Sequence, residues 1–223
     1  MDERLRLAVD ASVGWYDALC ALHGVGCGVE DGLWVAYGAP PPLHSAAKTV
    51  EPGVDPGRAV GAVEGLSSTS VADSFGELDL APHGFHLLID ARWLHAPPPP
   101  PRDLPSGWTV VRTADDLAAW TTHHDAAQVL LPGLLERSSF TVLAHRRADR
   151  MVAGAVTRLG TGVVDLSNVW SAPGHDLDRA ELLTAVAALH PGRDVVGYEA
   201  GDDLTRALEA GFTDVGPQLV WAR

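Results

Sequence analysis

Two short segments of the chain nearly repeat each other. PGVDPGRA at 52–59 and PGHDLDRA at 173–180 share proline, glycine, aspartate, arginine and alanine at the same spacing. Each is followed by a Gly-Phe pair and an extended run that ends in tryptophan, at 84–93 and at 211–221. A period of about 120 residues is too long for a solenoid repeat, so it predicts a duplicated domain or half-domain.

Composition limits the class of protein and its partners. The 223 residues suit one large domain or two small ones, and a hydrophobic content of 46% allows a packed core. The net charge of −13 would repel a phosphate backbone, so we expect no nucleic-acid partner. No apolar run is long enough for a membrane span, and the N-terminal segment lacks a signal peptide's apolar centre. We therefore expect a cytoplasmic protein without a membrane partner.

The residues that commonly bind metals or form disulfides are few or scattered. The two cysteines form no disulfide framework. The ten histidines show no His-x-x-x-His spacing, and the adjacent pair His123-His124 would face about 100° apart on a helix, so no metal is expected. The basic run 145–147 lies between two strand-like segments and is interpreted as a solvated hairpin turn.

A proline-rich segment divides the chain. APPPPPRDLP at 96–105 contains five consecutive prolines, which favour a stiff extended spacer over a helix or a central strand. The predicted organisation is an N-terminal unit at 1–95, a linker at 96–105 and a C-terminal unit at 106–223.

The C-terminal unit has a regular alternation of helical and extended patterns. Capping pairs at Thr113–Asp116 and Asp178–Glu181 predict two helix starts. The predicted order is strand, two helices, three antiparallel strands, helix, strand, helix and strand. The strand after the helix at 178 should pair in parallel with the strand before it. This order predicts an α/β fold with a mixed sheet and helices on both faces.

The N-terminal unit follows the latter half of the same pattern. The segment 24–32 has spaced glycines and is interpreted as a flexible turn, and 75–80 is a poor helix. The other predicted elements are helices at 10–23 and 56–64 and strands at 33–37, 45–50, 70–73 and 85–93.

Two longer segments carry a family resemblance. DLSNVWSAP at 165–173 resembles the fourth strand of the GNAT (N-acetyltransferase) superfamily, and ALEAGFTDVGPQLVW at 207–221 resembles its closing helix, Gly-Phe turn and last strand. Residues 43–93 resemble a degraded copy of the C-terminal half of that fold. The resemblance implies a GNAT-like acyl-CoA N-acyltransferase fold with one near-complete unit and one degraded half-unit, a tandem arrangement.

The resemblance also implies where acetyl-CoA would bind. In the family, a loop of the type Arg/Gln-x-x-Gly-x-Gly/Ala holds the pyrophosphate with backbone N–H groups at a helix N-terminus. Here the loop at 172–183 has one glycine and several acidic side chains, which would repel an anionic ligand. The cofactor-binding candidates are Val169, Trp170, Ser171, Gly174 and His175.

The catalytic candidates are Tyr198 and Glu199, at the end of the predicted fifth strand. A phenol beside a carboxylate can serve acid–base chemistry, although Tyr198 can equally be a buried tyrosine with a satisfied hydroxyl. The family often has a tyrosine four residues before the glycine of its Gly-Phe turn, where it can protonate a departing thiolate. That position here is Ala207.

Three functions remain open from the sequence. The loop with a single glycine and the missing tyrosine favour a weak or non-catalytic member of the superfamily. Such a protein would bind a small molecule in the cleft of the C-terminal unit. An active acetyl-CoA-dependent N-acetyltransferase, with Tyr198 or a water assisting the amine, is the first alternative. A protein-interaction scaffold built from the two related units is the second. The acceptor substrate and the oligomeric state do not follow from the sequence.

Overall fold

The computed structural model describes residues 1–66, 68–98, 100, 102–124 and 126–223, which form two compact units. The first unit contains Met1–Leu94, Tyr198–Leu204 and Asp214–Arg223, and the second contains His95–Gly197 and Thr205–Thr213. Pro99 and Pro101 of the predicted linker lie outside the described residues. The units are thus interleaved in sequence, whereas the prediction placed all of 106–223 in one consecutive unit.

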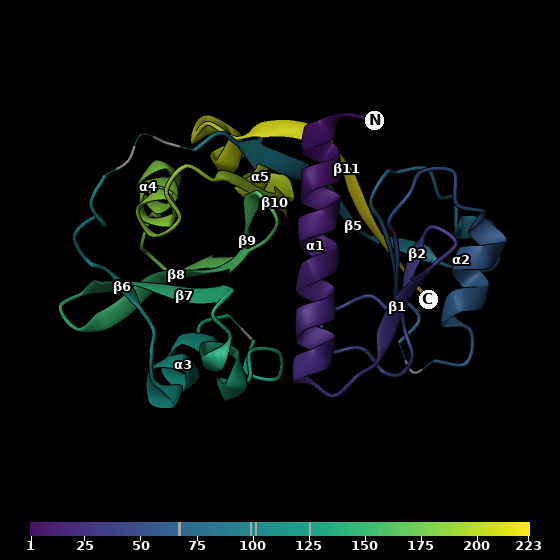
Figure 1. The fold of residues 1–223 in the computed structure, drawn as a ribbon, viewed down its shortest axis with the longest axis horizontal. Coiled ribbons are helices and arrows are strands. Elements are labelled where there is room, and N and C mark those ends of the chain that lie inside the picture. Colours follow the sequence, from purple (N-terminus) through teal and green to yellow (C-terminus); the bar gives the residue numbers. More distant parts are fainter. Residues whose placement is uncertain (67, 99, 101, 125) are drawn as a thin grey trace. The chain divides into compact units, whose positions relative to one another are not determined.

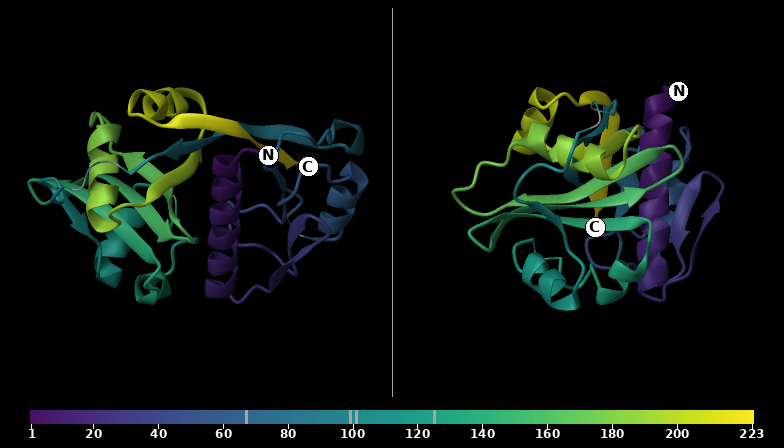
Figure 2. Two further views of the ribbon diagram at one scale, coloured as in Figure 1. Left: turned by 45° about the horizontal axis from the view of Figure 1, so that its top comes forward. Right: turned by 60° about the vertical axis from the view of Figure 1, so that its left-hand side comes forward.

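The second unit follows the predicted order of elements. Its strands are β6 (Trp108–Val110), β7 (Phe140–Arg147), β8 (Arg150–Leu159), β9 (Val163–Ser171) and most of β10 (Asp194–Glu199). β6 to β9 are antiparallel neighbours, and β10 pairs with β9 in parallel. Helices α3 (Ala114–Thr121) and α4 (Arg179–Leu189) cover opposite faces of these strands (Figure 1 and Figure 2). The predicted mixed sheet with helices on both faces is confirmed.

The first unit contains a second parallel crossover. Its elements are α1 (Glu3–Leu22), β1 (Cys27–Glu30), β2 (Leu33–Ala36), β3 (Ala47–Thr49), α2 (Pro56–Val63), β4 (Val71–Asp73), η1 (Ala81–His83), most of β5 (His86–Ala96) and of β11 (Thr213–Ala222), and the start of α5 (Gly201–Glu209). β3 and β4 pair in parallel through α2, as β9 and β10 do through α4. The strand order in this unit is β1-β2-β3-β4-β11-β5.

Alternation along β2 explains how two helices sandwich the sheet of the first unit. Leu33 and Val35 pack in the cluster that contains α2 residues, whereas Trp34 and Ala36 pack with Cys20 of α1. Because successive side chains of a strand point to opposite faces, α1 and α2 cover opposite faces of this sheet.

The last strand of the chain completes the sheet of the first unit. β11 pairs antiparallel with β4, with Leu219 opposite Asp73 and Trp221 opposite Val71. Trp221 also packs against the cluster around α2. This pairing places 214–223 in the first unit, where sequence order alone placed it in the C-terminal unit.

Three local predictions were wrong. The segment predicted as a flexible turn contains β1, because Cys27–Glu30 pairs with β2. The poor helix at 75–80 does not form, because the carboxylate of Asp73 accepts hydrogen bonds from the backbone N–H groups of Phe75 (3.1 Å) and Leu78 (2.8 Å) and fixes a turn. The basic run 145–147 forms the end of β7, with His145 only 8% exposed, and the exposed hairpin turn is formed by the next two residues, 148–149.

Gly154 on β8 lies where two tryptophan rings approach the sheet. A Cβ atom at this position would fall inside contact distance of Trp120 Nε1 and 2.6 Å from Trp170 Nε1. We predict that Gly154→Ala lowers the free energy of unfolding by about 1–3 kcal/mol, because the packed rings cannot move apart without losing contacts. Urea denaturation followed by tryptophan fluorescence measures this change.

Gly160→Ala is the matched control. Its added Cβ would have no neighbour closer than 3.6 Å. We expect a change below about 0.5 kcal/mol for this variant. Equal losses in the two variants would show that the tryptophan rings do not limit the space at Gly154.

Candidate functional site

Strand β9 carries a bulge just before its end. Ser167 lies opposite Val156 and Trp170 opposite Gly154, so Asn168 and Val169 together face one residue of β8. Asn168 has a φ of +52°, in the left-handed region that asparagine tolerates better than most residues. Bulges of this kind re-aim side chains and backbone groups, often beside functional sites.

The parallel strands β9 and β10 pair over a short stretch only. Val163, Val164 and Asp165 lie opposite Asp194, Val195 and Val196. Beyond this point, the described residues of β9 pair with β8 alone. Asn168–Ser171 therefore has no β10 partner among the described pairs; Asn168 and Val169 are partly exposed and Ser171 is exposed, whereas Trp170 is buried.

Backbone hydrogen bonds to β8 and within the loop fix the segment that follows β9. The N–H of Ala172 donates to the carbonyl of Val152 (2.8 Å), and the N–H of His175 donates to the carbonyl of Ala172 (3.0 Å). Gly174 has a φ of +79°, and no atom would lie within 4 Å of an added Cβ. Glycine is thus needed here for its backbone conformation, and the space beside it is open.

The N-terminus of α4 is occupied by the protein's own carboxylate. Asp178 accepts hydrogen bonds from the backbone N–H groups of Ala180 (2.9 Å) and Glu181 (3.0 Å). Glu181 in turn accepts a hydrogen bond from the indole N–H of Trp108 (2.8 Å). The predicted cap is confirmed, and it uses the N–H groups and the dipole end that would otherwise attract an anion.

His175 belongs to a cluster of aromatic and imidazole rings. The rings of His175 and His145 have centroids 5.5 Å apart, and His145 stacks on Trp108 at 5.1 Å and 11°. Burial lowers the pKa of His145, the carboxylate of Glu181 opposes this, and His175 and Arg147 lower it further. His175 itself is half-buried.

Trp170 is a core residue. It is 5% exposed, and its ring meets the ring of Trp120 edge-on at 5.6 Å and 81°. The Trp170 Nε1 atom has no hydrogen-bond acceptor among the described residues. A ligand along β9 would therefore contact the backbone of Trp170, with the side chains of Val169 and Ser171 beside it.

His123 is a site residue that the sequence reasoning missed. Its ring stacks on Trp170 at 4.7 Å and 16°, and His124 meets Trp120 edge-on at 6.0 Å. The sequence gives no signal for this contact, because it depends on how α3 packs over β9. The two histidines are held by tryptophans, and His123 remains exposed beside the bulge.

Tyr198 and Glu199 group with the first unit. Tyr198 is 42% exposed, so it is not the buried tyrosine considered above. Its ring meets that of Trp93 edge-on at 5.6 Å and 84°. That Tyr198 and Glu199 share a cleft with the loop at 172–178 stays a prediction.

The crossover of the first unit, from β3 through α2 to β4, has a matching loop glycine but different side chains at the ends of its two strands. Gly53 has a φ of +76°, and Asp55 caps α2 by accepting a hydrogen bond from the N–H of Arg58 (3.0 Å). At the end of β3, the hydroxyl of Thr49 donates to the carboxylate of Asp73 (3.3 Å) and accepts from the N–H of Ser74 (2.7 Å). These bonds tie β3 to β4 at the point where β9 is free of β10.

Lys48 of β3 lies next to Thr49 in the core of the first unit. It is fully buried, and its ammonium lies 4.8 Å from the ring centre of Trp93 and 5.3 Å from that of Tyr16. Both contacts fall within the range of cation–π attraction. The corresponding residue of the second copy, counted from the shared Pro-Gly, is Val169. The sequence could not predict that this lysine is buried.

The described residues form neither a candidate metal centre nor a membrane-spanning helix. No group of three or more histidine, cysteine, aspartate or glutamate side chains is placed to hold a metal ion there. None of the helices in the described ranges is both long and apolar enough to cross a bilayer.

Comparison with known proteins identifies the fold. No family model and no curated protein matches the chain. Among solved structures, it is similar to a GCN5-related N-acetyltransferase from Kribbella flavida, with 17% identity, coverage of 97% of this chain and 96% of that one, and a TM-score of 0.65. A putative GNAT-family acetyltransferase from Novosphingobium aromaticivorans has 15% identity, 96% coverage of both chains and a TM-score of 0.61. A GCN5-related N-acetyltransferase-like protein from Streptococcus suis has 13% identity, 99% coverage of both and a TM-score of 0.55.

These similarities extend over nearly the whole chain. The predicted GNAT acyltransferase fold is thereby confirmed.

Protonation should destabilise the folded protein. Burial lowers the pKa of His44, His145 and His190 below the ordinary value of 6.5. As pH falls below about 6.5, the unfolded chain binds protons at these histidines before the folded chain does, so the free energy of unfolding decreases. We predict a loss of stability between pH 7.5 and 5.5 by urea denaturation.

His145→Gln should make that loss smaller, because one buried titrating group is removed. The exposed His83 provides the control, and His83→Gln should leave the pH dependence unchanged. Identical pH dependence in wild type and His145→Gln would show that His145 is not part of the response.

Proposed function

We propose that this chain is a GNAT-fold protein whose second unit binds a small molecule along β9, with weak affinity for acetyl-CoA and little or no acyl transfer. The observation that carries the proposal is the hydrogen bonding of Asp178 to the N–H groups of Ala180 and Glu181. These are N–H groups at the α4 N-terminus that a pyrophosphate would use. A carboxylate that already occupies them both blocks and repels such a group.

The residues therefore fit the two ends of an acyl-CoA molecule differently. The bulge at Asn168 and the unpaired backbone up to Ser171 suit an extended ligand that hydrogen-bonds to the strand edge. The loop does not suit a pyrophosphate, because its N–H groups of Ala172 and His175 already donate to the carbonyls of Val152 and Ala172. A ligand that lacks the nucleotide end would satisfy both parts of the site.

The proton-transfer groups also argue against an efficient enzyme. Ala207, at the position where the family often has its tyrosine, is 1% exposed and has no titratable group. Tyr198 beside Glu199 is the remaining candidate for acid–base chemistry.

The first unit is proposed to have no acyl-CoA site. Thr49, Asp73 and Ser74 tie β3 to β4 by hydrogen bonds, and Lys48 occupies the space beside them. The matching glycines Gly53 and Gly174 support the interpretation of the two crossovers as diverged copies. On this interpretation the first copy has become structural.

An active N-acetyltransferase on an unknown amine is the alternative. The geometry of β9 favours it, because a backbone freed by a bulge can hold an acyl-pantetheine arm as in the family. His123, exposed and stacked on Trp170, could then contact an acceptor.

The experiment is an acetyl-CoA titration read by thermal unfolding, with wild type and Asp178→Ser compared. Serine can also cap a helix, so this variant keeps the α4 N-terminus while removing the negative charge. We predict little stabilisation of wild type at millimolar acetyl-CoA and affinity about tenfold higher in Asp178→Ser, a difference of about 1.4 kcal/mol.

Asp176→Ser is the matched control, because it removes the same charge from the same loop but not from the cap. Its effect should be smaller than that of Asp178→Ser. Stabilisation of wild type by roughly 2.7 kcal/mol, expected for a ligand at 100 times its dissociation constant, would contradict the proposal. Release of free CoA thiol with an amine acceptor would favour the enzyme.

A further inference from the structure

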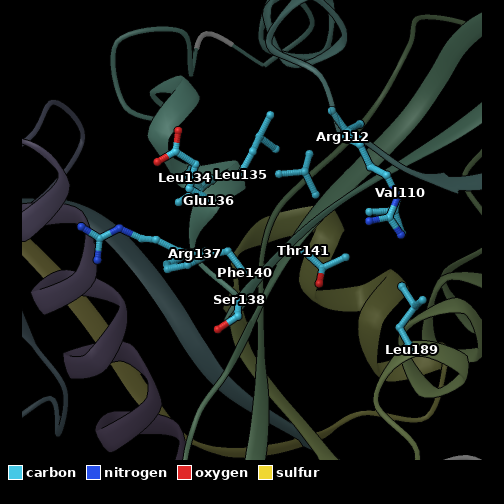
Figure 3. A pocket seen from close by; sticks show the side chains of 12 residues that line it. Val110, Arg112, Leu134, Leu135, Glu136, Arg137, Ser138, Phe140, Thr141 and Leu189 are labelled. Atoms are coloured by element: carbon cyan, nitrogen blue, oxygen red, sulfur yellow. The ribbon is translucent and has the colours of Figure 1, made fainter.

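A pocket of about 380 Å³ lies in the second unit, outside the site described above. It is bounded by β6, β7, the short helix η2 (Pro132–Glu136) and the last residue of α4, Leu189. Figure 3 shows the side chains that line it. A volume of this size falls within the range of small-molecule sites in proteins.

The pocket lies at the opposite end of the sheet from the loop at 172–178. Phe140, at its edge, pairs with Arg158 on β8, and Arg158 pairs with Asp165 in the N-terminal half of β9. The loop follows the C-terminal end of the same strand. Leu189 ends α4, whereas the loop precedes its start, and the helix rise separates them by roughly 16 Å. A ligand in this pocket would not be bound acetyl-CoA.

The apolar residues that line the pocket lie on both faces of β7. Leu134, Phe140 and Val142 line it and are each at least nine-tenths buried. Leu135 and Leu189 line it from partly buried positions. Because successive side chains of β7 alternate, Thr141 lies on the α4 face with Leu189, whereas Phe140 and Val142 lie on the opposite face.

The rim of the pocket carries polar side chains that have no partner. The side chains of Arg112, Arg137, Ser138 and Thr141 make no hydrogen bond or ion pair with any described residue. Other arginines of the chain are bonded to carboxylates, such as Arg58 to Asp31 and Arg92 to Asp214. With Arg112 and Arg137 against the single carboxylate of Glu136, the lining has an excess of one positive charge in a protein with a net charge of −13.

The distribution of charge across the pocket indicates which side of it would bind an anionic group. Figure 3 shows Arg112 on one side and Glu136 with Arg137 on the other, separated by apolar side chains. Arg112 therefore has no carboxylate beside it within the pocket. Its guanidinium offers the planar pair of donors that matches a carboxylate or a phosphate.

We propose that this pocket binds a small organic anion on the α4 side of the strands, with its carboxylate or phosphate on Arg112 and its apolar body against Val110 and Leu189. The hydroxyl of Thr141 is available as a further donor to the anion. The proposal does not depend on the function proposed for β9, because it uses none of the same residues.

The test is isothermal titration calorimetry with phenyl phosphate, benzoate and inorganic phosphate as probes. We expect phenyl phosphate or benzoate to bind with one site per chain and inorganic phosphate to bind at least tenfold more weakly, because it lacks the apolar body. The stronger of the two aromatic probes identifies the anion that the site prefers. Equal affinity for all three, or no binding of any, would overturn the proposal.

Variants separate specific binding from general charge attraction. Arg112→Gln should weaken aromatic-anion binding by about tenfold or more, whereas Arg150→Gln removes the same charge from the exposed β7–β8 hairpin and should have no effect. Leu189→Trp should fill the pocket and abolish binding without a change in charge. Unchanged binding in both Arg112→Gln and Leu189→Trp would overturn the assignment.

Discussion

The parallel pairing of β9 with β10 is the contact on which the second unit depends. It holds the two ends of the crossover through α4 together, and it is made by only Val163–Asp165 and Asp194–Val196. Because the ladder is so short, the end of β9 must be held otherwise, by β8 and by the packing of Trp170 beneath α3. The short pairing also leaves the backbone at the bulge without a β10 partner, where a ligand could bind. The structural need for a crossover and the possibility of a ligand site thus arise from one feature.

Comparison of the two crossovers shows how such a site can be lost. Both have an aspartate that caps the crossover helix and a loop glycine with nearly the same φ. In the first, a threonine ties the strands and a buried lysine lies beside it, whereas in the second the position of the lysine is taken by Val169. The capping aspartates are not equivalent by alignment, since Asp55 corresponds to Asp176 and not to Asp178. The repeat is therefore conserved in its loop and shifted by two residues at the helix start.

The sequence predicted the elements of the second unit well because their signals are local. Capping pairs at Thr113 and Asp178, together with apolar periodicity, locate helices without knowledge of the partners they pack on. The site was predicted less completely, because its decisive contacts are long-range. The stacking of His123 on Trp170 joins residues 47 positions apart in the chain, and the burial of His145 depends on Trp108. The strand at 27–30 was missed because the spaced glycines of 24–32 favour a turn, and its pairing with β2 is not visible in the local sequence.

The position of β11 has a consequence for how the protein is made. Strand β4 pairs with β3 early in the sequence but with β11 only through residues about 150 positions later. During synthesis, one edge of β4 therefore stays without a partner until almost the whole chain has emerged from the ribosome. An open strand edge invites pairing with other chains. The short length of β4 and the carboxylate of Asp73 at its end limit such pairing until β11 has been synthesised.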